Sequence, residues 1–339
     1  MRALGAIREV LVVRLGRLGD IILLLPAIAA LKQRIPGCRL TLLTDHRYAP
    51  LAQLSPVIDE VIPINRLEMR DGNKLLAIAA LMRLLRSIRR RRFDLIVDFH
   101  SFTETQLMAG LSRARNRIAI RRFNETYLSF CFNQPPVEED KAIHVAEMFL
   151  RLADAIQLGT PGSSGSIRLL EPTAAARNTM REALPQGSMV GFYVGARARD
   201  HLWSAERFAS LADQIVREFD SPVVLIGGRS SEEQALTEDI LRRLQNRDRV
   251  IVLPSPDLAE LVAAISSLRL LVSNDSGPMH IGPAVGVPTL GLFSRSSPQH
   301  YKPFSPQSRY LWAEPIERIS VEAVMSVVRE MWLARSSSF

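Results

Sequence analysis

The stretch Arg269-Leu-Leu-Val-Ser-Asn-Asp-Ser-Gly-Pro-Met-His-Ile-Gly-Pro-Ala-Val-Gly-Val-Pro-Thr-Leu-Gly-Leu-Phe293 decides the fold. An apolar run, 270–272, leads into a polar turn, 274–278, and then into a short helical segment and a second apolar run, 288–293. Strand, turn, helix and strand in this order are typical of an open parallel sheet. In such a sheet ligands lie at the carboxyl ends of the strands, and the next helix directs its N–H groups at them. We therefore expect residues 275–277 to face an anionic, hydroxylated ligand.

Each residue of this turn also has a purely structural interpretation. Asp275 or Ser276 suits the N-cap of the following helix, and Pro278 suits its first turn, where a missing N–H costs nothing. His280 lies on a mostly apolar helix, where a histidine is more often buried and hydrogen-bonded than catalytic. The local pattern alone leaves these alternatives open.

The chain is long enough for two domains, and its charge is divided unevenly between its halves. Residues 1–155 contain 24 Lys/Arg against 16 Asp/Glu, whereas residues 156–339 contain 19 of each, so the net charge of +8 belongs to the amino-terminal half. This predicts an acidic partner: a phosphorylated or carboxylated acceptor, an anionic membrane surface or nucleic acid. The arginine runs at 89–92 and 113–117 have no interleaved aromatic residues, so nucleic acid is not expected. Each run is also consistent with a solvated helix face.

Cysteine content and hydropathy predict a cytoplasmic protein. Cys38 and Cys131 lie among apolar neighbours and make neither a disulfide framework nor a zinc site. The apolar stretch 21–31 is too short to span a bilayer, and it lacks the order of segments that marks a signal peptide. We expect a soluble chain that at most rests on the surface of a membrane.

Strand and helix patterns alternate along the whole chain, which predicts parallel α/β domains. The expected strands are 9–15, 40–44, 61–64, 93–99, 117–120, 188–194, 222–226 and 249–253, and the expected helices are 73–90, 103–111, 144–158, 204–219, 231–245 and 257–268. The run Gly159-Thr-Pro-Gly-Ser-Ser-Gly165 indicates a linker. We predict a first domain at 1–158, a linker at 159–172, a second domain at 173–320, and a last helix within 321–339 that packs back on the first domain.

The first strand is followed by Gly16-Arg-Leu-Gly-Asp20, where glycines allow a sharp turn and close approach to a ligand. This run is not Gly-x-Gly-x-x-Gly, and the chain has no Walker A loop, so dinucleotide-dependent and P-loop enzymes lose their main support. Asp20 suits a helix N-cap as well as a ligand site. Two doubly wound domains would place such a loop in a cleft between the carboxyl ends of their sheets.

Three segments together resemble glycosyltransferase family 9, the bacterial lipopolysaccharide heptosyltransferases. They are 12–31 with its Gly-Asp, Phe93-Asp-Leu-Ile-Val-Asp-Phe-His100, and Ser273-Asn-Asp-Ser-Gly-Pro-Met-His280 followed by Gly286-Val-Pro-Thr-Leu-Gly-Leu-Phe293. The resemblance covers about residues 9–305. It implies the GT-B architecture: two Rossmann-like domains facing across a cleft, with the acceptor on the first and the nucleotide sugar on the second. It also implies inverting transfer of heptose from ADP-heptose to the acidic inner core of lipopolysaccharide, without a metal or other cofactor.

The resemblance implies roles for particular residues of this chain. Asp20 would be the general base that takes a proton from the acceptor hydroxyl. The expected acceptor side comprises Arg14, Arg17, Gly19 and Arg121. The expected donor side comprises Gly195, Arg197, His201, Glu232, Asp275, Ser276, Gly277, Pro278 and His280, with Pro256 near the adenine.

One position departs from the family pattern. His201, in Asp200-His-Leu-Trp-Ser204, stands where the family has a lysine that contacts the diphosphate. Histidine is only partly charged at neutral pH, so we expect part of the phosphate stabilisation to come from Arg197 or Arg199. The alternatives to an ADP-heptose transferase are a GT-B enzyme that uses another nucleotide sugar, an epimerase, and a nucleotide-sugar-binding protein without catalysis. The expected location is the cytoplasm, with peripheral association at the inner membrane.

Overall fold

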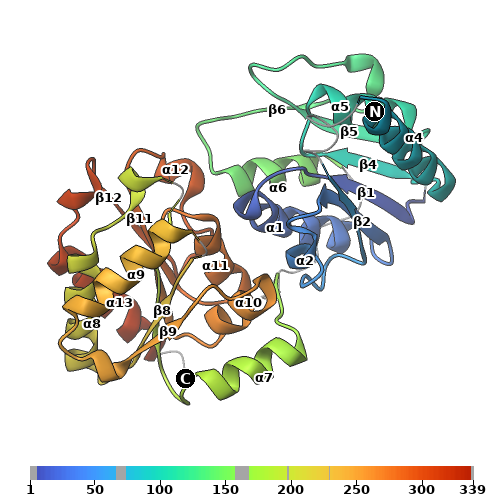
Figure 1. The fold of residues 1–339 in the computed structure, drawn as a ribbon. Coiled ribbons are helices and arrows are strands. Elements are labelled where there is room, and N and C mark those ends of the chain that lie inside the picture. The colour runs from blue at the N-terminus through green and yellow to red at the C-terminus, as the bar shows by residue number, and fades with distance from the viewer. Residues whose placement is uncertain (1–5, 66–73, 157–167, 197, 229, 337–339) are drawn as a thin grey trace. The chain divides into compact units, whose positions relative to one another are not determined.

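The computed structural model of the chain describes residues 6–65, 74–156, 168–196, 198–228 and 230–336. The chain divides into two compact units, residues 1–169 and 170–339. Each unit contains one parallel six-stranded sheet with helices on both of its faces (Figure 1). The prediction of two doubly wound α/β units is confirmed. Most of the predicted linker, 159–172, lies outside the described residues.

The sheet of the first unit has the strand order β3-β2-β1-β4-β5-β6. Its strands are β1 (Glu9–Val13), β2 (Arg39–Asp45), β3 (Glu60–Ile64), β4 (Leu95–Asp98), β5 (Asn116–Arg121) and β6 (Val137–Glu138). Its helices are α1 (Leu18–Arg34), α2 (Ala49–Ala52), α4 (Lys74–Arg91), α5 (Thr103–Leu111), η1 (Ser129–Cys131) and α6 (Val145–Ala155). The order reverses between β1 and β4, which makes this the switch point where ligands bind in such sheets.

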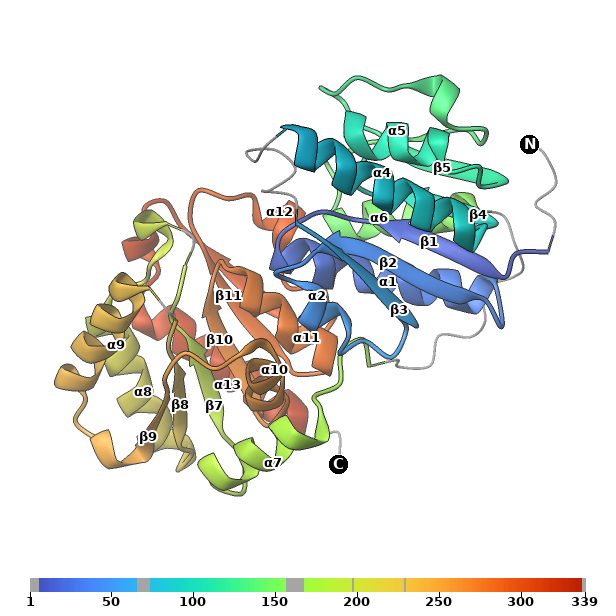
Figure 2. The ribbon, with the colours of Figure 1, turned by 45° about the vertical axis from the view of Figure 1, so that its right-hand side comes forward.

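Helices cover both faces of the first sheet, so its central strand β1 is apolar at every position after Glu9. Leu11 and Val13 of β1 share a buried cluster with Ile88 of α4 and Met108 of α5. Helices α1 and α6 pack together on the opposite face (Figures 1 and 2). Burial on both sides explains the continuous apolar run of β1, which is typical of parallel sheets.

The sheet of the second unit has the order β12-β11-β10-β7-β8-β9, which is the same path when the strands of each unit are numbered from its own start. Its strands are β7 (Val190–Tyr193), β8 (Val223–Ile226), β9 (Val250–Leu253), β10 (Leu270–Asn274), β11 (Thr289–Phe293) and β12 (Arg309–Trp312). Its helices are α7 (Ala174–Ala183), η2 (Arg199–His201), α8 (Ala205–Phe219), α9 (Ser231–Arg243), η3 (Arg247–Arg249), α10 (Leu258–Ser266), η4 (Gly277–His280), α11 (Ile281–Val285), α12 (Pro298–Tyr301), η5 (Ile316–Arg318) and α13 (Val321–Ser336). The switch point lies between β7 and β10.

The last helix, α13, belongs to the second unit. Its apolar residues Val324, Met325 and Val328 are fully buried in the core that also contains α8 and the strands of this sheet. Trp332 stacks on Phe219 at the end of α8, with ring centroids 4.7 Å apart. These contacts bury the apolar face of the helix inside its own unit. Additional packing of α13 on the first domain stays a prediction.

The described residues contain neither a membrane-spanning helix nor a disulfide bond. No helix in the described part of the chain is long and apolar enough to cross a membrane. Cys38 and Cys131 are both buried and neither forms a disulfide, as predicted.

Candidate active site

A cavity of about 450 Å³ opens at the switch point of the first sheet. Its walls come from the segments that follow four strands of this sheet. They are Arg14, Leu15, Gly16, Arg17 and Asp20 after β1, Arg47 and Tyr48 after β2, His100 and Phe102 after β4, and Arg122 after β5. Four arginines therefore surround one carboxylate, which makes the cavity suited to an anionic ligand with a hydroxyl to deprotonate.

Asp20 lies in the first turn of α1 and faces this cavity. One carboxylate oxygen accepts a hydrogen bond from the Arg17 amide at 2.8 Å, and the other accepts one from Nη2 of Arg14 at 2.6 Å. The side chain keeps 27% of its surface exposed. Burial raises the pKa of the Asp20 carboxyl, but the Arg14 guanidinium and the Arg17 amide outweigh it and hold the pKa below its usual range. Asp20 is thus both a helix-start acceptor and an ionised group in the cavity.

Gly16 makes the position of Asp20 possible. A Cβ built on Gly16 would lie 2.4 Å from Asp20 Cβ and 2.7 Å from Asp20 Oδ2, far inside contact distance. Any side chain at residue 16 would therefore push the carboxylate away. The glycine in this loop serves close packing of the loop against the first turn of α1.

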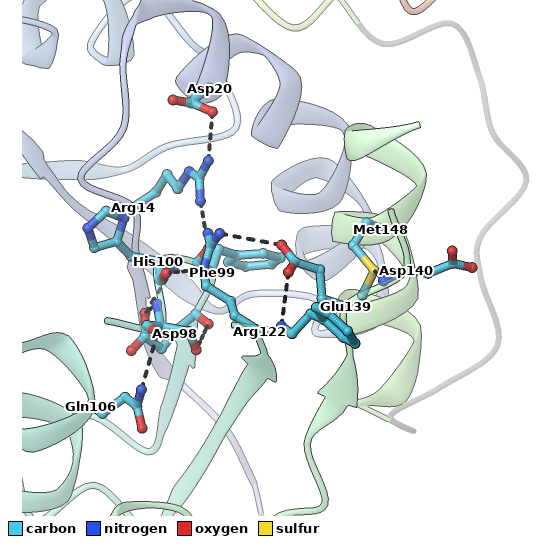
Figure 3. A network of polar contacts seen from close by, with 12 residues as sticks. Arg14, Asp20, Asp98, Phe99, His100, Gln106, Arg122, Glu139, Asp140 and Met148 are labelled. Carbon is cyan, nitrogen blue, oxygen red and sulfur yellow. Dashed lines mark hydrogen bonds and ion pairs between the residues drawn. The ribbon is translucent and has the colours of Figure 1, made fainter. Parts of the chain in front are cut away.

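The segment between β4 and α5 orients two of the arginines through its carbonyl groups (Figure 3). Arg14 donates from Nη1 to the carbonyl of Phe99 at 2.8 Å, and Arg122 donates from Nε to the carbonyl of His100 at 2.7 Å. Arg14 also lies over the ring of Phe149. Both guanidinium groups are thus held at the cavity by backbone atoms of one short segment.

The carboxylate of Asp98 fixes the conformation of that segment through hydrogen bonds to its backbone. Its Oδ1 accepts hydrogen bonds from the amides of His100 and Ser101 at 2.9 and 2.8 Å, and Ser101 adopts a φ of 54°. A positive φ is uncommon for serine and persists where the surroundings demand it. Asp98 is fully buried, and this burial raises its pKa to about 6. The loop that holds the arginines therefore depends on an ionisable buried carboxyl.

The structure brings only some of the predicted acceptor residues into the cavity. Arg14 and Arg17 line it. Gly19 is part of α1 and is not among the lining residues, and Arg121 is exposed beside Glu138, 3.4 Å away. Arg122, the next residue, takes the place we had expected for Arg121, because β5 ends between them and the chain turns toward the cavity.

Asn274 and Asp275 hold the switch point of the second sheet. Asn274 is fully buried; its Nδ2 donates to the carbonyl of Val194 at 2.7 Å, and its Oδ1 accepts from the amide of Trp203. The turn after β10 is thereby tied to the loop after β7. Asp275, the next residue, accepts a short hydrogen bond from Ser296. The side chain of Asp275 is partly exposed, so it is available to a ligand.

His201 lies against Asp275. Its Nδ1 is 3.5 Å from Asp275 Oδ2, and its Nε2 is 3.8 Å from Asp200 Oδ1. Arg295, which follows β11, pairs with Asp200 at 2.8 Å. Sequence reasoning missed Arg295, although its position just after an apolar strand could have indicated it. Arg197 lies outside the described residues, as does the side chain of Arg199.

Two glycines and a glutamate form a second feature at the carboxyl ends of β7 and β8. A Cβ on Gly195 would lie 2.1 Å from Glu233 Oε1, and a Cβ on Gly228 would lie 2.0 Å from Glu233 Oε2. The carboxylate of Glu233 therefore fills the space that both glycines leave. Glu233 also bonds Ser230 in the capping box of α9. The prediction named Glu232, but it is Glu233 that the structure brings to Gly195.

The other predicted donor residues follow the strand ends as well. Ser276 precedes η4 without a side-chain capping bond, while Gly277 and Pro278 begin that helix. His280 ends η4 and is buried. Pro256 follows β9, beside Ser255, whose hydroxyl donates to the carbonyl of Gly228 at 2.7 Å. All these residues belong to the carboxyl edge of the second sheet.

Comparison with known proteins gives the same assignment along most of the chain. Residues 81–326 match glycosyltransferase family 9 (heptosyltransferase). Lipopolysaccharide heptosyltransferase 3 of Escherichia coli is 23% identical over 302 residues, which cover 87% of this chain and 86% of that protein.

Solved structures share the fold. A glycosyl transferase family 9 protein from Veillonella parvula DSM 2008 has a TM-score of 0.82 at 23% identity, with 96% of this chain and 97% of that chain covered. The E. coli heptosyltransferase WaaC with ADP-2-deoxy-2-fluoro heptose has a TM-score of 0.77 at 17% identity, with 95% and 99% covered. Since the family match spans more than half of its length, the chain belongs to glycosyltransferase family 9, the heptosyltransferases.

Proposed function

We propose that this enzyme transfers heptose from ADP-heptose to an acidic acceptor of the lipopolysaccharide core, with inversion and with Asp20 as general base. The observation that carries the proposal is the partly exposed carboxylate of Asp20 in a cavity with four arginines. The acceptor oxygen attacks the anomeric carbon, the bond from that carbon to the ADP oxygen breaks, and ADP leaves with the electron pair. Asp20 receives the acceptor proton. A single displacement needs no second, covalent carboxylate.

The low pKa of Asp20 is consistent with its proposed role as general base. The carboxylate is ionised at neutral pH and can accept a proton, because Arg14 and the Arg17 amide stabilise its charged form. Arg14, Arg17 and Arg122 are proposed to bind the carboxylates or phosphates of the acceptor, since guanidinium groups suit both geometrically. Arg14 would thus serve both the base and the acceptor.

We propose that the donor binds at the carboxyl edge of the second sheet. The solved structure of WaaC holds ADP-2-deoxy-2-fluoro heptose, which supports this class of donor for a relative of the same fold. Asp275 would accept hydrogen bonds from heptose hydroxyls, and the loop that follows it, with Gly277, would lie against the diphosphate. Glu233, rather than Glu232, would accept from the ribose hydroxyls. Arg295, which pairs with Asp200 beside His201, would supply a permanent positive charge at this edge.

Mass spectrometry of reaction products tests the proposal. The protein is incubated with ADP-heptose alone and with ADP-heptose plus a panel of truncated core acceptors. We expect one heptose added to one acceptor and one ADP released per transfer, with no reaction of the donor alone and no effect of a chelator. Donor isomerisation without acceptor would indicate an epimerase instead. Tight donor binding without turnover on any acceptor would indicate a binding protein.

A further inference from the structure

The side of the first unit formed by α4, α5 and η1 carries exposed apolar side chains. Of the ten large apolar side chains that are exposed in the described part of the chain, six lie between residues 81 and 130. Five of them belong to the outer surfaces of these three helices: Leu81, Met82, Leu107, Leu111 and Phe130. Phe130 is 75% exposed, and Leu111 is 51% exposed. We call this surface the outer face.

The three helices lie side by side, so these residues share one side of the unit. Ile88, Met108 and Cys131, one from each helix, are buried in the same cluster against the same face of the sheet. Arg89 of α4 donates from Nε to the carbonyl of Leu111 at the end of α5, at 2.7 Å. Both ribbon views show α4 next to α5 (Figures 1 and 2). The outward sides of the helices therefore form a continuous surface.

Arginines are frequent in the segment that carries the outer face. Residues 81–130 contain 11 arginines and four acidic residues. Of these four, Asp98 is buried, Asp94 accepts hydrogen bonds from the backbone of residues 8 and 9, and Glu104 and Glu125 are exposed. The exposed arginines of α4 and of the segment just after α5 are Arg83, Arg86, Arg90, Arg91, Arg113 and Arg115, of which Arg91 pairs with Glu60. The outer face is thus apolar and strongly basic at once.

We infer that the outer face docks this enzyme on an anionic phospholipid bilayer. Leucine, methionine and phenylalanine side chains can enter the boundary between headgroups and acyl chains, while arginines extend to the phosphates around them. A bilayer satisfies both kinds of side chain over a broad, shallow surface. Charge complementarity commits the face to an anionic rather than a neutral surface. The inference goes beyond the transfer reaction, because lipid binding needs neither donor nor acceptor.

Co-sedimentation of the full chain with vesicles tests the inference. The vesicles are phosphatidylcholine alone, or phosphatidylcholine and phosphatidylglycerol in a two-to-one ratio. We expect binding to the anionic vesicles that weakens as salt is added, and little binding to the neutral ones. The triple variant R83Q/R86Q/R90Q should bind anionic vesicles about a hundred-fold more weakly, since each arginine at such a surface contributes roughly a factor of five.

A second variant and a matched control separate docking from general charge. L107S/L111S/F130S keeps every arginine and should lose binding about ten-fold or more, because the apolar insertion is removed. R177Q/R181Q/R318Q removes three exposed arginines of the other unit and should bind like the wild type. Both outer-face variants should transfer heptose to a lipid-free core fragment at the wild-type rate. A wild-type protein that ignores anionic vesicles, or an R83Q/R86Q/R90Q variant that binds as the wild type does, would overturn the inference. If the wild-type protein does not bind the vesicles, an acidic protein becomes the expected partner of this face.

Discussion

The two switch points have the same strand path and opposite chemistry. In the first unit a charged side chain joins the two central strands, because Arg14 at the end of β1 donates to the carbonyl of Phe99 after β4. In the second unit a neutral amide makes the equivalent connection, from Asn274 at the end of β10 to the carbonyl of Val194 after β7. Both hydrogen bonds join the loops after the two central strands at the carboxyl edge of the sheet. The charged one also places a guanidinium beside the carboxylate of Asp20, our proposed general base, whereas the neutral one leaves the side chain of the next residue, Asp275, partly exposed.

This difference indicates how one fold can serve the two binding tasks that we propose. The first edge concentrates arginines, which suit an acidic acceptor, and the second presents glycines, a carboxylate and a histidine, which suit a nucleotide sugar. The sheet sets where the loops lie, and the loop residues set what they bind. Each variant below alters one edge and leaves the other as it is.

Removing the carboxylate at the first edge should have the largest effect. We expect D20A to lower kcat by about 10² to 10⁴, the usual contribution of a general base, while the Kd for the ADP-heptose donor stays within about two-fold. D20N should show a similar loss of turnover. D154A, which removes an exposed carboxylate outside the cavity, is the matched control. Turnover near the wild-type rate in D20A, with the fold intact by circular dichroism, would show that another group is the base.

The buried carboxyl of Asp98 should make the stability of the first unit depend on pH. Its folded pKa of about 6 lies above the ordinary value of 3.8, so the native state holds this proton where the unfolded chain has lost it. The stabilisation is complete below about pH 4 and is lost as the pH rises through 6. Relative to D98N, the wild type should lose up to about 2–3 kcal/mol of unfolding free energy between pH 4 and pH 7, as measured with urea.

The opposite sign at Asp20 provides the control for that measurement. Its lowered pKa means that its contribution is present above the ordinary value and is lost only as the pH falls further. The difference between the wild type and D20N should therefore stay constant from pH 5 to pH 8. If D98N followed the wild type over the whole range, Asp98 would not be protonated in the native state at pH 5.

Neighbouring glutamates on α9 offer a sharper test of the second edge. E233Q should weaken ADP binding about ten-fold in calorimetry, since a charged acceptor binds hydroxyls more strongly than an amide by about 1–1.5 kcal/mol. Glutamine can keep the capping box with Ser230, so the helix start should survive. E232Q, one residue away, should bind ADP as the wild type does. The reverse ranking would return the assignment to Glu232.

Placing the family lysine in this chain should give the smallest change. H201K places a permanently charged ammonium group next to Asp275, where it can reach the diphosphate, and should tighten ADP-heptose binding about three-fold at pH 8. H300K, which adds the same charge elsewhere in the unit, should have no effect on the Kd. Weaker binding by H201K would mean that a cation at residue 201 competes with the heptose for Asp275.

Most of the fold could be predicted because buried parallel strands are continuous apolar runs, and the loops after them are marked by glycine and aspartate. Helix α7 was missed, since only Ala176 and Met180 of it are buried and its alanines give little periodicity. The edge strand β12 was missed because three of its four residues are exposed.

The candidate site was predicted less completely, for a geometric reason. Arg121 and Arg122 are chemically identical, and only the exact end of β5 decides which one turns to the cavity. Glu232 and Glu233 differ in the same way, by about 100° around a helix. Asp98 was placed inside the strand predicted at 93–99, because its hydrogen bonds to two backbone amides depend on a turn that the residue types do not indicate.

The tight space at Gly16 offers a way to separate substrate binding from turnover in this enzyme. The Cβ of an alanine at residue 16 would collide with the side chain of Asp20 and displace its carboxylate, while every charged residue of the cavity stays in the chain. Such a protein should still capture the acidic acceptor and the nucleotide sugar, yet fail to join them. It would be a substrate trap, suited to crystallising both substrates together before reaction.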